Sequence, residues 1–263
     1  MTQTRVRAHT NRQRTVHVEH CMGTAFTIDI RDPGNWSDAI RDVVSWLHKV
    51  DHVFSTYRHE SDISRLRRGE LTLEAANPEI ADVLGLCADA QLTTAGYFTA
   101  MLNGQLDPTG LVKGWAIEHA SRRLTAHGAA NHAINGGGDM QLVGEGASGR
   151  PWTVGISNPR DSSRVLTVVS GRDFAVATSG TAERGAHVID PFTGRPASRA
   201  LSATVTGPSL TWADAYATAV VVMGAAGVRW IAEVDEYEGL VVAPDGTCHR
   251  SSGWSIPTDT RSY

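Results

Sequence analysis

Asp214 and Thr218 carry oxygen atoms at a spacing that suits the ligands of a hard cation. They lie in TWADAYATAVVVMG, residues 211–224, whose alanines favour a helix between Thr211 as N-cap and Gly224 as its end. Residues four apart share one face of such a helix. A carboxylate and a hydroxyl so placed can hold Mg²⁺, which prefers oxygen ligands. The alternative is structural, because an Asp in a first turn and a helical Thr bonding backwards need no ligand.

A turn, DPTG at residues 107–110, precedes another candidate region. We expect a helix to follow it from about Lys113 to Ala126 and to end at Gly128. Backbone groups beside the start of a helix can meet phosphate or a metal ion. The glycines of NGGGD, residues 135–139, allow close approach of the backbone to a ligand or form a tight turn. They do not follow the GxGxxG spacing, so no dinucleotide fingerprint is predicted.

The elements that must position these residues are helices mostly first and short strands mostly later. Helical spacing and start signals predict further helices at residues 36–54, 78–96 and 228–233, and a short polar helix after an initial loop within 54–69. Alternating apolar residues predict strands within 16–30, as one strand or two, and at 133–135, 140–143, 152–157, 165–169, 174–177 and 202–205, with a last hairpin turning at Asp245-Gly246. Because no regular βαβ alternation is present, we expect an α+β fold with mixed, short-stranded sheets packed against amphipathic helices.

The composition is that of a soluble globular protein, with 41% hydrophobic and 20% charged residues. A net charge of −4 gives no basic field for nucleic acid. The three cysteines are far apart and form no CxxC pair, so neither a disulfide framework nor a zinc site is predicted. The first residues lack an apolar signal region, and we expect a cytoplasmic protein without a membrane anchor. Residues 1–14 are predicted as a mobile arm and residues 15–263 as one domain.

Eight short motifs, in order over about residues 21–255, resemble the ApbE family of flavin transferases. They are MGT at 22–24, FSTYRHESDISRL at 54–66, AGYF at 95–98, DPTGLVKG at 107–114, NGGGD at 135–139, ATSG at 177–180, HVIDPFTGRP at 187–196 and ADAYATA at 213–219. The most specific are the motifs that begin at His187 and at Ala213. The resemblance implies the family's T-fold-like architecture.

The resemblance also implies an activity, namely transfer of FMN from FAD to a Ser or Thr hydroxyl of an acceptor protein with release of AMP. It implies Mg²⁺ held by Asp214, Thr218 and a backbone carbonyl of the 107–114 segment, that of Gly110. His187 falls on the histidine that activates the acceptor hydroxyl, with the capping of a strand as the structural alternative. The positions that fall on the family's FAD contacts are Met22, Tyr57, Tyr97, Phe98, Thr99, Asp107, Lys113 and Val188.

The sequence departs from the family pattern in two places. Between Gly96 and Asp107 the family has a longer insertion with a strand pair, whereas here the chain runs almost directly into the next motif. Pro108-Thr109 replaces a Leu-Gly pair, which stiffens the turn. A shortened pocket wall leaves room for a second activity, an Mg²⁺-dependent FAD pyrophosphatase that uses water as acceptor. A non-catalytic FAD-binding protein is the third alternative, against which the joint presence of Asp214, Thr218 and His187 argues.

Overall fold

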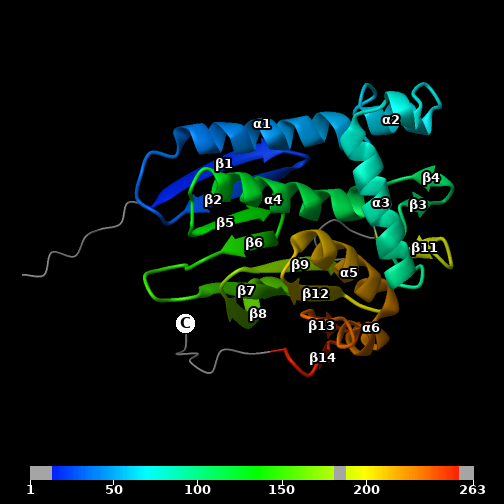
Figure 1. Ribbon diagram of the computed structural model, residues 1–263. Helices are drawn as coiled ribbons and strands as arrows, with labels where there is room; N and C mark the ends of the chain where they lie inside the picture. Colours follow the sequence, from blue (N-terminus) through cyan, green and yellow to red (C-terminus); the bar gives the residue numbers. More distant parts are fainter. Residues whose placement is uncertain (1–13, 181–187, 255–263) are drawn as a thin grey trace, which may run out of the picture.

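An antiparallel sheet forms the centre of the molecule in the computed structural model, which describes residues 14–180 and 188–254 (Figure 1). Its eight strands follow the order β1-β2-β5-β6-β9-β12-β13-β14. The strands are β1 Thr15–Cys21, β2 Thr24–Ile30, β5 His132–Gly136, β6 Asp139–Val143, β9 Phe174–Gly180, β12 Ser202–Gly207, β13 Glu238–Val242 and β14 Cys248–Arg250. The expected stretch 16–30 is therefore two strands, which meet at a tight turn at Met22-Gly23.

Helices cover one face of this sheet (Figure 1). The described helices are α1 Ser37–Phe54, α2 Asp62–Arg67, the 3₁₀ turn η1 Leu73–Ala75, α3 Pro78–Thr93, α4 Thr109–Ala126, α5 Leu210–Met223 and α6 Ala225–Ile231. Of these, α4, α5 and α6 pack directly on the central sheet, whereas α2 contacts α1 and β4. α4 packs on β5 and β6, and α5 on β9 and β12, so the two helices lie side by side. Gly114 permits this approach, because a Cβ atom there would lie 2.5 Å from the Leu210 carbonyl oxygen. α1 packs outside α4, where Trp46 Nε1 donates to the Ala116 carbonyl at 2.9 Å.

A two-stranded hairpin, β7 Trp152–Asn158 and β8 Asp161–Gly171, covers the other face. Along β7, Trp152, Val154 and Ile156 are buried while the residues between them are not, as period-two alternation requires. They form a second apolar cluster with Leu142 and Val176 of the central sheet. The sheet thus separates two cores, a large one beneath the helices and a smaller one beneath the hairpin.

Two further hairpins lie together at one end of the molecule, near α3 (Figure 1). One joins β3 Met101–Leu102 to β4 Gln105–Leu106, and the other joins β10 Ile189–Asp190 to β11 Arg195–Pro196. The expectation that the shortened 96–107 segment lacks a strand pair is therefore wrong. The turn of the first hairpin is Asn103-Gly104, both with positive φ, which is the pairing that two-residue hairpins favour.

Most predicted elements are confirmed, but two helix starts are not. α4 begins at Thr109 and not near Lys113, because the Asp107 carboxylate accepts hydrogen bonds from the Thr109 amide and hydroxyl. α5 begins at Leu210 after Ser209, so Thr211 is not its N-cap.

The predicted arm, residues 1–14, lies outside the described residues apart from Arg14. Its guanidinium bonds both carboxylate oxygens of Asp29, at 2.9 and 2.8 Å. The last residue of that predicted arm is therefore held by the sheet. In the described part of the chain, every helix is too short or too polar to cross a bilayer.

Candidate functional site

Three charged side chains meet at the end of α4 that faces α5. Lys113 pairs with Asp139, which follows the β5–β6 turn, and its Nζ lies 3.7 Å from Asp214 Oδ1 on α5. Asp214 Oδ2 accepts from the Gly114 amide at 2.9 Å, and Asp139 Oδ1 accepts from the Thr178 amide at 2.9 Å. Two buried carboxylates therefore share one ammonium group.

Burial raises the pKa of Asp214 to about 7, since a charged carboxylate loses its hydration there. Lys113 acts in the opposite direction by favouring the charged form, and the neighbouring Asp139 adds to the increase. Lys113 therefore offsets only part of the effect of burial on the pKa of Asp214. A further cation beside Asp214 would favour its ionised form.

Thr218 lies one helical turn after Asp214, as its spacing predicts, and joins the oxygen-rich cluster. Its Oγ1 lies 3.2 Å from Ser179 Oγ on β9. A Cβ atom on Gly110 would lie 3.8 Å from Thr218 Oγ1, so the backbone of α4 passes close to this hydroxyl. The structure therefore brings Gly110, Lys113, Asp214 and Thr218 together, as the sequence predicts.

The Gly110 carbonyl shares its ordinary helical hydrogen-bond donor, the Gly114 amide, with Asp214. In an α-helix the amide of residue 114 donates to the carbonyl of residue 110. Here the Gly114 amide donates to Asp214, which competes with that carbonyl for the same hydrogen atom. A carbonyl oxygen in this position is a suitable additional ligand for a hard cation.

Asp107 fixes the start of α4 at the edge of the cluster. Besides its bonds to Thr109, its Oδ2 lies 3.2 Å from an Arg67 guanidinium nitrogen. Arg67 also donates to the Leu106 carbonyl, so α2 is tied to the segment that enters α4. Through these contacts Asp107 holds the start of α4, and with it Gly110 and Lys113, in place.

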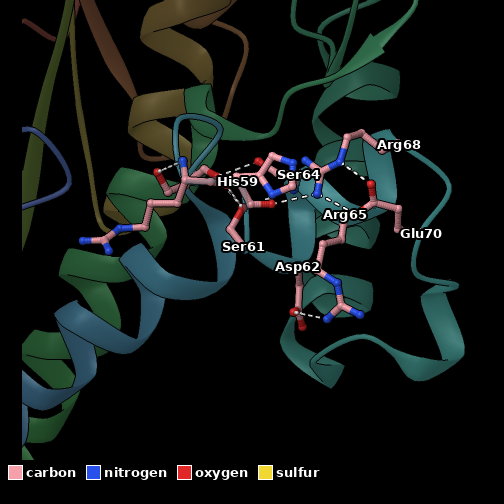
Figure 2. A network of polar contacts seen from close by, with 9 residues as sticks. His59, Ser61, Asp62, Ser64, Arg65, Arg68 and Glu70 are labelled. Atoms are coloured by element: carbon pink, nitrogen blue, oxygen red, sulfur yellow. Dashed lines mark hydrogen bonds and ion pairs between the residues drawn. The ribbon is translucent and has the colours of Figure 1, made fainter.

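Tyr57 lies on the loop between α1 and α2, with 98% of its surface exposed. Polar contacts hold the loop: Ser61 Oγ donates to the Ser55 carbonyl at 2.5 Å and caps α2 by accepting from the Ser64 amide at 3.2 Å. Figure 2 shows the neighbouring part of the network, in which Arg68 joins the Glu70 carboxylate to the His59 carbonyl. An aromatic ring exposed on a loop held in this way is available for stacking.

The predicted FAD contacts at 97–99 differ in their exposure. Tyr97 packs edge-on against Phe192, with 4.9 Å between ring centroids. Phe98 is buried, and a Cβ atom on Gly110 would lie 3.3 Å from its ring, so only its backbone is available to a ligand. Thr99 Oγ1 donates to Gln91 Oε1 at 3.2 Å and accepts from the Met101 amide at 3.0 Å.

The remaining predicted site residues are Met22, Val188 and His187. Met22 occupies the β1–β2 turn with a φ of 48° and packs partly against the main core. Val188 is 7% exposed, and its carbonyl accepts from the Ala197 amide at 2.8 Å. His187, the predicted base, lies outside the described residues.

Sequence reasoning assigned no role to three residues that the structure places here. Asp139 and Ser179 belong to the NGGGD and ATSG motifs, which were a signal that ligand chemistry gathers there. Glu118 of α4 is the third. Its Oε2 accepts from the hydroxyl of Ser209 at 2.6 Å and from the amide and hydroxyl of Thr211 at 2.9 and 2.7 Å. It therefore caps α5 from a neighbouring helix, which spacing within α5 does not reveal.

Comparison with known proteins identifies relatives of this sequence. It matches the family model described as ApbE family over residues 22–104 and 100–241. The FAD:protein FMN transferase of Vibrio cholerae is 33% identical over 147 residues, which cover 52% of this chain and 44% of that protein. That of Treponema pallidum is 33% identical over 168 residues, which cover 57% of this chain and 46% of that protein. The matched part spans less than half the length of these curated relatives.

Solved structures share the fold. The flavin transferase ApbE from Vibrio cholerae has a TM-score of 0.80 at 23% identity, over 91% of this chain and 97% of that one. The ApbE protein from Thermotoga maritima also has a TM-score of 0.80, at 22% identity, over 91% of this chain and 97% of that one. The expected α+β fold is thereby confirmed.

Proposed function

Because the chain belongs to the ApbE family, we propose that it transfers FMN from FAD to a Ser or Thr hydroxyl of an acceptor protein and releases AMP. The observation that carries this proposal is the buried Asp214, which shares Lys113 with a second carboxylate beside the hydroxyl of Thr218. Covalent flavinylation of this kind is a phosphoryl transfer, which depends mainly on positioning and on compensating negative charge.

The donor set fits Mg²⁺. Asp214 supplies a carboxylate, Thr218 a hydroxyl and Gly110 a backbone carbonyl, all of them the oxygen ligands that this ion prefers. Burial raises the pKa of Asp214, and a cation bound beside it would lower that pKa again. No cluster of three or more His, Cys, Asp or Glu side chains able to bind a metal occurs in residues 14–180 and 188–254. The proposed ligands include only one carboxylate, which leaves positions for water and for phosphate oxygens of FAD.

The chain's own residues then divide the chemistry. When bound, Mg²⁺ would neutralise charge on the diphosphate. Lys113 adds a point charge beside the same phosphates, and its ion pair with Asp139 holds it in position. His187 accepts the proton of the acceptor hydroxyl as its oxygen bonds to the FMN phosphorus and the bond to the AMP oxygen breaks.

FAD would be held by the remaining predicted contacts. Tyr57 and Tyr97 supply aromatic surface for stacking, whereas Phe98 and Val188 contribute backbone groups, since their side chains are buried. Asp107, Thr99 and Met22 complete the proposed set of contacts. We assign the reaction to the cytoplasm, which agrees with three free thiols at Cys21, Cys87 and Cys248.

FAD hydrolysis is the second candidate, in which water takes the place of the acceptor hydroxyl. The short β3–β4 hairpin supports it, because its turn has only two residues, Asn103 and Gly104, where the family pattern has a longer insertion. The two activities use the same cluster and give different products. One yields protein-bound FMN with AMP, and the other yields free FMN with AMP.

The test incubates the purified chain with FAD and Mg²⁺, or with chelator, in a soluble lysate of its source. Flavin fluorescence on a denaturing gel reports transfer, and chromatography reports AMP and free FMN. We expect fluorescent bands and AMP that both disappear in chelator. AMP with equal free FMN and no band would assign hydrolysis, and intact FAD would refute both candidates.

His187 is tested separately. We expect His187→Ala to abolish transfer while FAD binding, followed by quenching of flavin fluorescence, stays near that of the wild type. His249, which lies on the edge strand β14, provides a control as His249→Ala. Unchanged transfer by His187→Ala would remove the residue from the mechanism.

A further inference from the structure

A hollow of about 480 Å³ adjoins the β10–β11 hairpin. It is lined by Asp190, Thr193, Arg195, Pro196, Ser198 and Arg199. Arg195 and Arg199 are both exposed, and within the part of the chain that the structure describes neither guanidinium makes a hydrogen bond or ion pair. Two arginines and one aspartate leave an excess of positive charge around the hollow, which attracts an anionic group.

Asp190 also lines the hollow and is paired across the hairpin with Arg195, but its carboxylate forms no ion pair with either arginine among the described residues. It is 8% exposed, and its Oδ1 accepts from the Phe192 amide at 2.9 Å. Its carbonyl accepts from the amides of Thr193 and Gly194, so the residue stabilises the turn of its own hairpin. The guanidinium groups are therefore left for an external carboxylate, with which Arg forms strong, paired hydrogen bonds.

The position of the hollow connects it with the proposed reaction. Asp190 follows His187 by three residues, so at most ~10 Å of extended chain separates them. The hairpin also contacts the segment assigned to FAD: Phe192 packs on Tyr97, and a Cβ atom on Gly194 would lie 3.4 Å from Asn103 Oδ1. A polypeptide that brings a hydroxyl to His187 therefore comes near the hairpin.

The surface beside the hollow is apolar. Phe192 at the turn of the β10–β11 hairpin is 63% exposed, and Met101 on the neighbouring β3 is 53% exposed. Figure 1 shows β3, β4 and β11 at the same end of the molecule. Aromatic and Met side chains beside arginines are typical of protein-binding surfaces, whereas a small free anion needs no apolar contact.

We propose that Phe192, Arg195 and Arg199 form the docking surface for the acceptor protein, with an acidic side chain close in sequence to the acceptor hydroxyl seated in the hollow. This inference rests on the proposed function. The carboxylate fixes the register of the acceptor segment, and the apolar surface supplies contact area. The two arginines thereby select acceptors and take no part in phosphoryl transfer.

The test uses the full chain, Mg²⁺, FAD and the acceptor identified from its fluorescent band. Arg195→Gln/Arg199→Gln is compared with Arg164→Gln, whose exposed side chain lies on β8. We expect the double variant to raise the KM for the acceptor at least ~tenfold and to shift the KM for FAD by less than ~twofold, because rim charges act mainly on the partner they face. Arg164→Gln keeps both values.

Reversing the charges on both the acceptor and the enzyme tests whether the arginines act by charge and not by supporting the fold. Each Asp or Glu near the flavinylated residue of the acceptor is replaced in turn by Lys, and transfer is measured with the wild type and with Arg195→Glu/Arg199→Glu. We expect one Lys-bearing acceptor to lose transfer with the wild type and to regain it with the charge-reversed enzyme.

Three results would overturn the docking surface: an acceptor without an acidic residue near its hydroxyl, an unchanged KM for the acceptor, or an equal rise in both KM values. The last result would assign the arginines to FAD or to its released anion. Failure of the proposed function looks different, because no protein would then be flavinylated by the wild type.

Discussion

Asp214 illustrates how one buried residue can favour function over stability. Its pKa, raised to about 7 by burial, lies far above the value of ~3.9 that an unfolded chain shows. Folding is therefore helped at low pH, where the carboxyl is protonated in both states. This help is lost as the pH rises through about 7, because the native state must then hold a poorly compensated charge.

We expect Asp214→Asn to lower Mg²⁺-dependent AMP release at least ~100-fold, because a ligand of the ion is lost. At pH 8 and without Mg²⁺ we expect the same variant to be at least as stable to heat as the wild type, since its amide oxygen can still accept from Gly114. AMP release and Tm, measured with and without Mg²⁺, check both parts. Asp245→Asn in the exposed last turn is the control, and undiminished activity in chelator would refute the metal site.

The thiols give a second prediction at this scale. Burial raises the pKa of Cys21 and Cys87 to about 12, with the charge of Asp51 adding to the effect on the first and that of Asp107 on the second. Cys248 is exposed on β14. Because the thiolate is the reactive form, we expect a disulfide reagent at pH 8 to modify Cys248 at once and the other two only in denaturant. Rapid modification of all three in the native protein would contradict their burial.

The packing of α4 against α5 depends on a glycine. A Cβ atom on Gly114 would lie 2.5 Å from the Leu210 carbonyl oxygen and 2.8 Å from Asp214 Cβ. We expect Gly114→Ala to lower the free energy of unfolding by ~1–3 kcal/mol and to weaken Mg²⁺ binding, because the helices must separate. Gly85→Ala in α3 is the matched control, since a Cβ atom there meets nothing within 4 Å.

For the control we expect a gain of ~0.5–1 kcal/mol, the usual advantage of Ala over Gly in a helix. Urea unfolding followed by circular dichroism measures both variants. Equal stability of Gly114→Ala and Gly85→Ala would show that α4 and α5 can accommodate a methyl group at their contact.

Glu118 holds the start of α5 in a pH-dependent way. Burial raises its pKa, but the hydrogen bonds from Ser209 and Thr211 outweigh that effect, so its pKa lies below the ordinary value. A lowered pKa contributes stability above the unfolded value of ~4.3, and this is lost as the pH falls through the folded value.

We expect Glu118→Gln to cost ~1–3 kcal/mol of unfolding free energy at pH 7 and progressively less below pH ~4.3, because a charged acceptor of several hydrogen bonds is lost. Unfolding in urea across this pH range is the measurement. Glu60→Gln, in the exposed α1–α2 loop, should show no such trend. A cost that persists at pH 3 would mean that packing of the side chain, and not its charge, supports α5.

At the scale of the whole molecule, the two cores should differ in local stability. β9 and β12 lie inside the central sheet with α5 against one face, whereas β7 and β8, among the described strands, pair only with each other. We expect amide hydrogen exchange to be slowest in β9 and β12 and clearly faster in β8, because interior strands open only with the whole fold. Exchange followed by mass spectrometry tests this, and slower exchange in β8 would refute it.

Sequence reasoning locates most of the fold because the periodic segments are long. The helix at 78–93 has its Asn77 cap and the last hairpin its Asp245-Gly246 turn, both local signals. The β3–β4 hairpin also has a local signal in the sequence, the Asn103-Gly104 pair at its turn. The order of strands in the sheet cannot be predicted from the sequence alone, because it depends on contacts between distant segments.

The candidate site, too, could be predicted from the sequence only where its signals are local. Asp214 and Thr218 were found from a four-residue spacing, which is local. Asp139 and Glu118 were not, because their partners lie 26 and 93 residues away in the sequence. Only packing of α4 against α5 and the sheet creates those contacts.

The distance in sequence between Lys113 and Asp214 also matters while the protein is being made. Chains fold from the amino end as they leave the ribosome, and α4 with β5 and β6 emerges well before α5. Until α5 docks, Lys113 and Asp139 are present without the ligand pair of Asp214 and Thr218. A nascent chain, or a fragment cut before residue 210, therefore lacks two of the proposed ligands, Asp214 and Thr218. If the centre acts as proposed, cleavage of FAD starts only after α5 has docked, and shorter products of synthesis leave the cell's flavin pool intact.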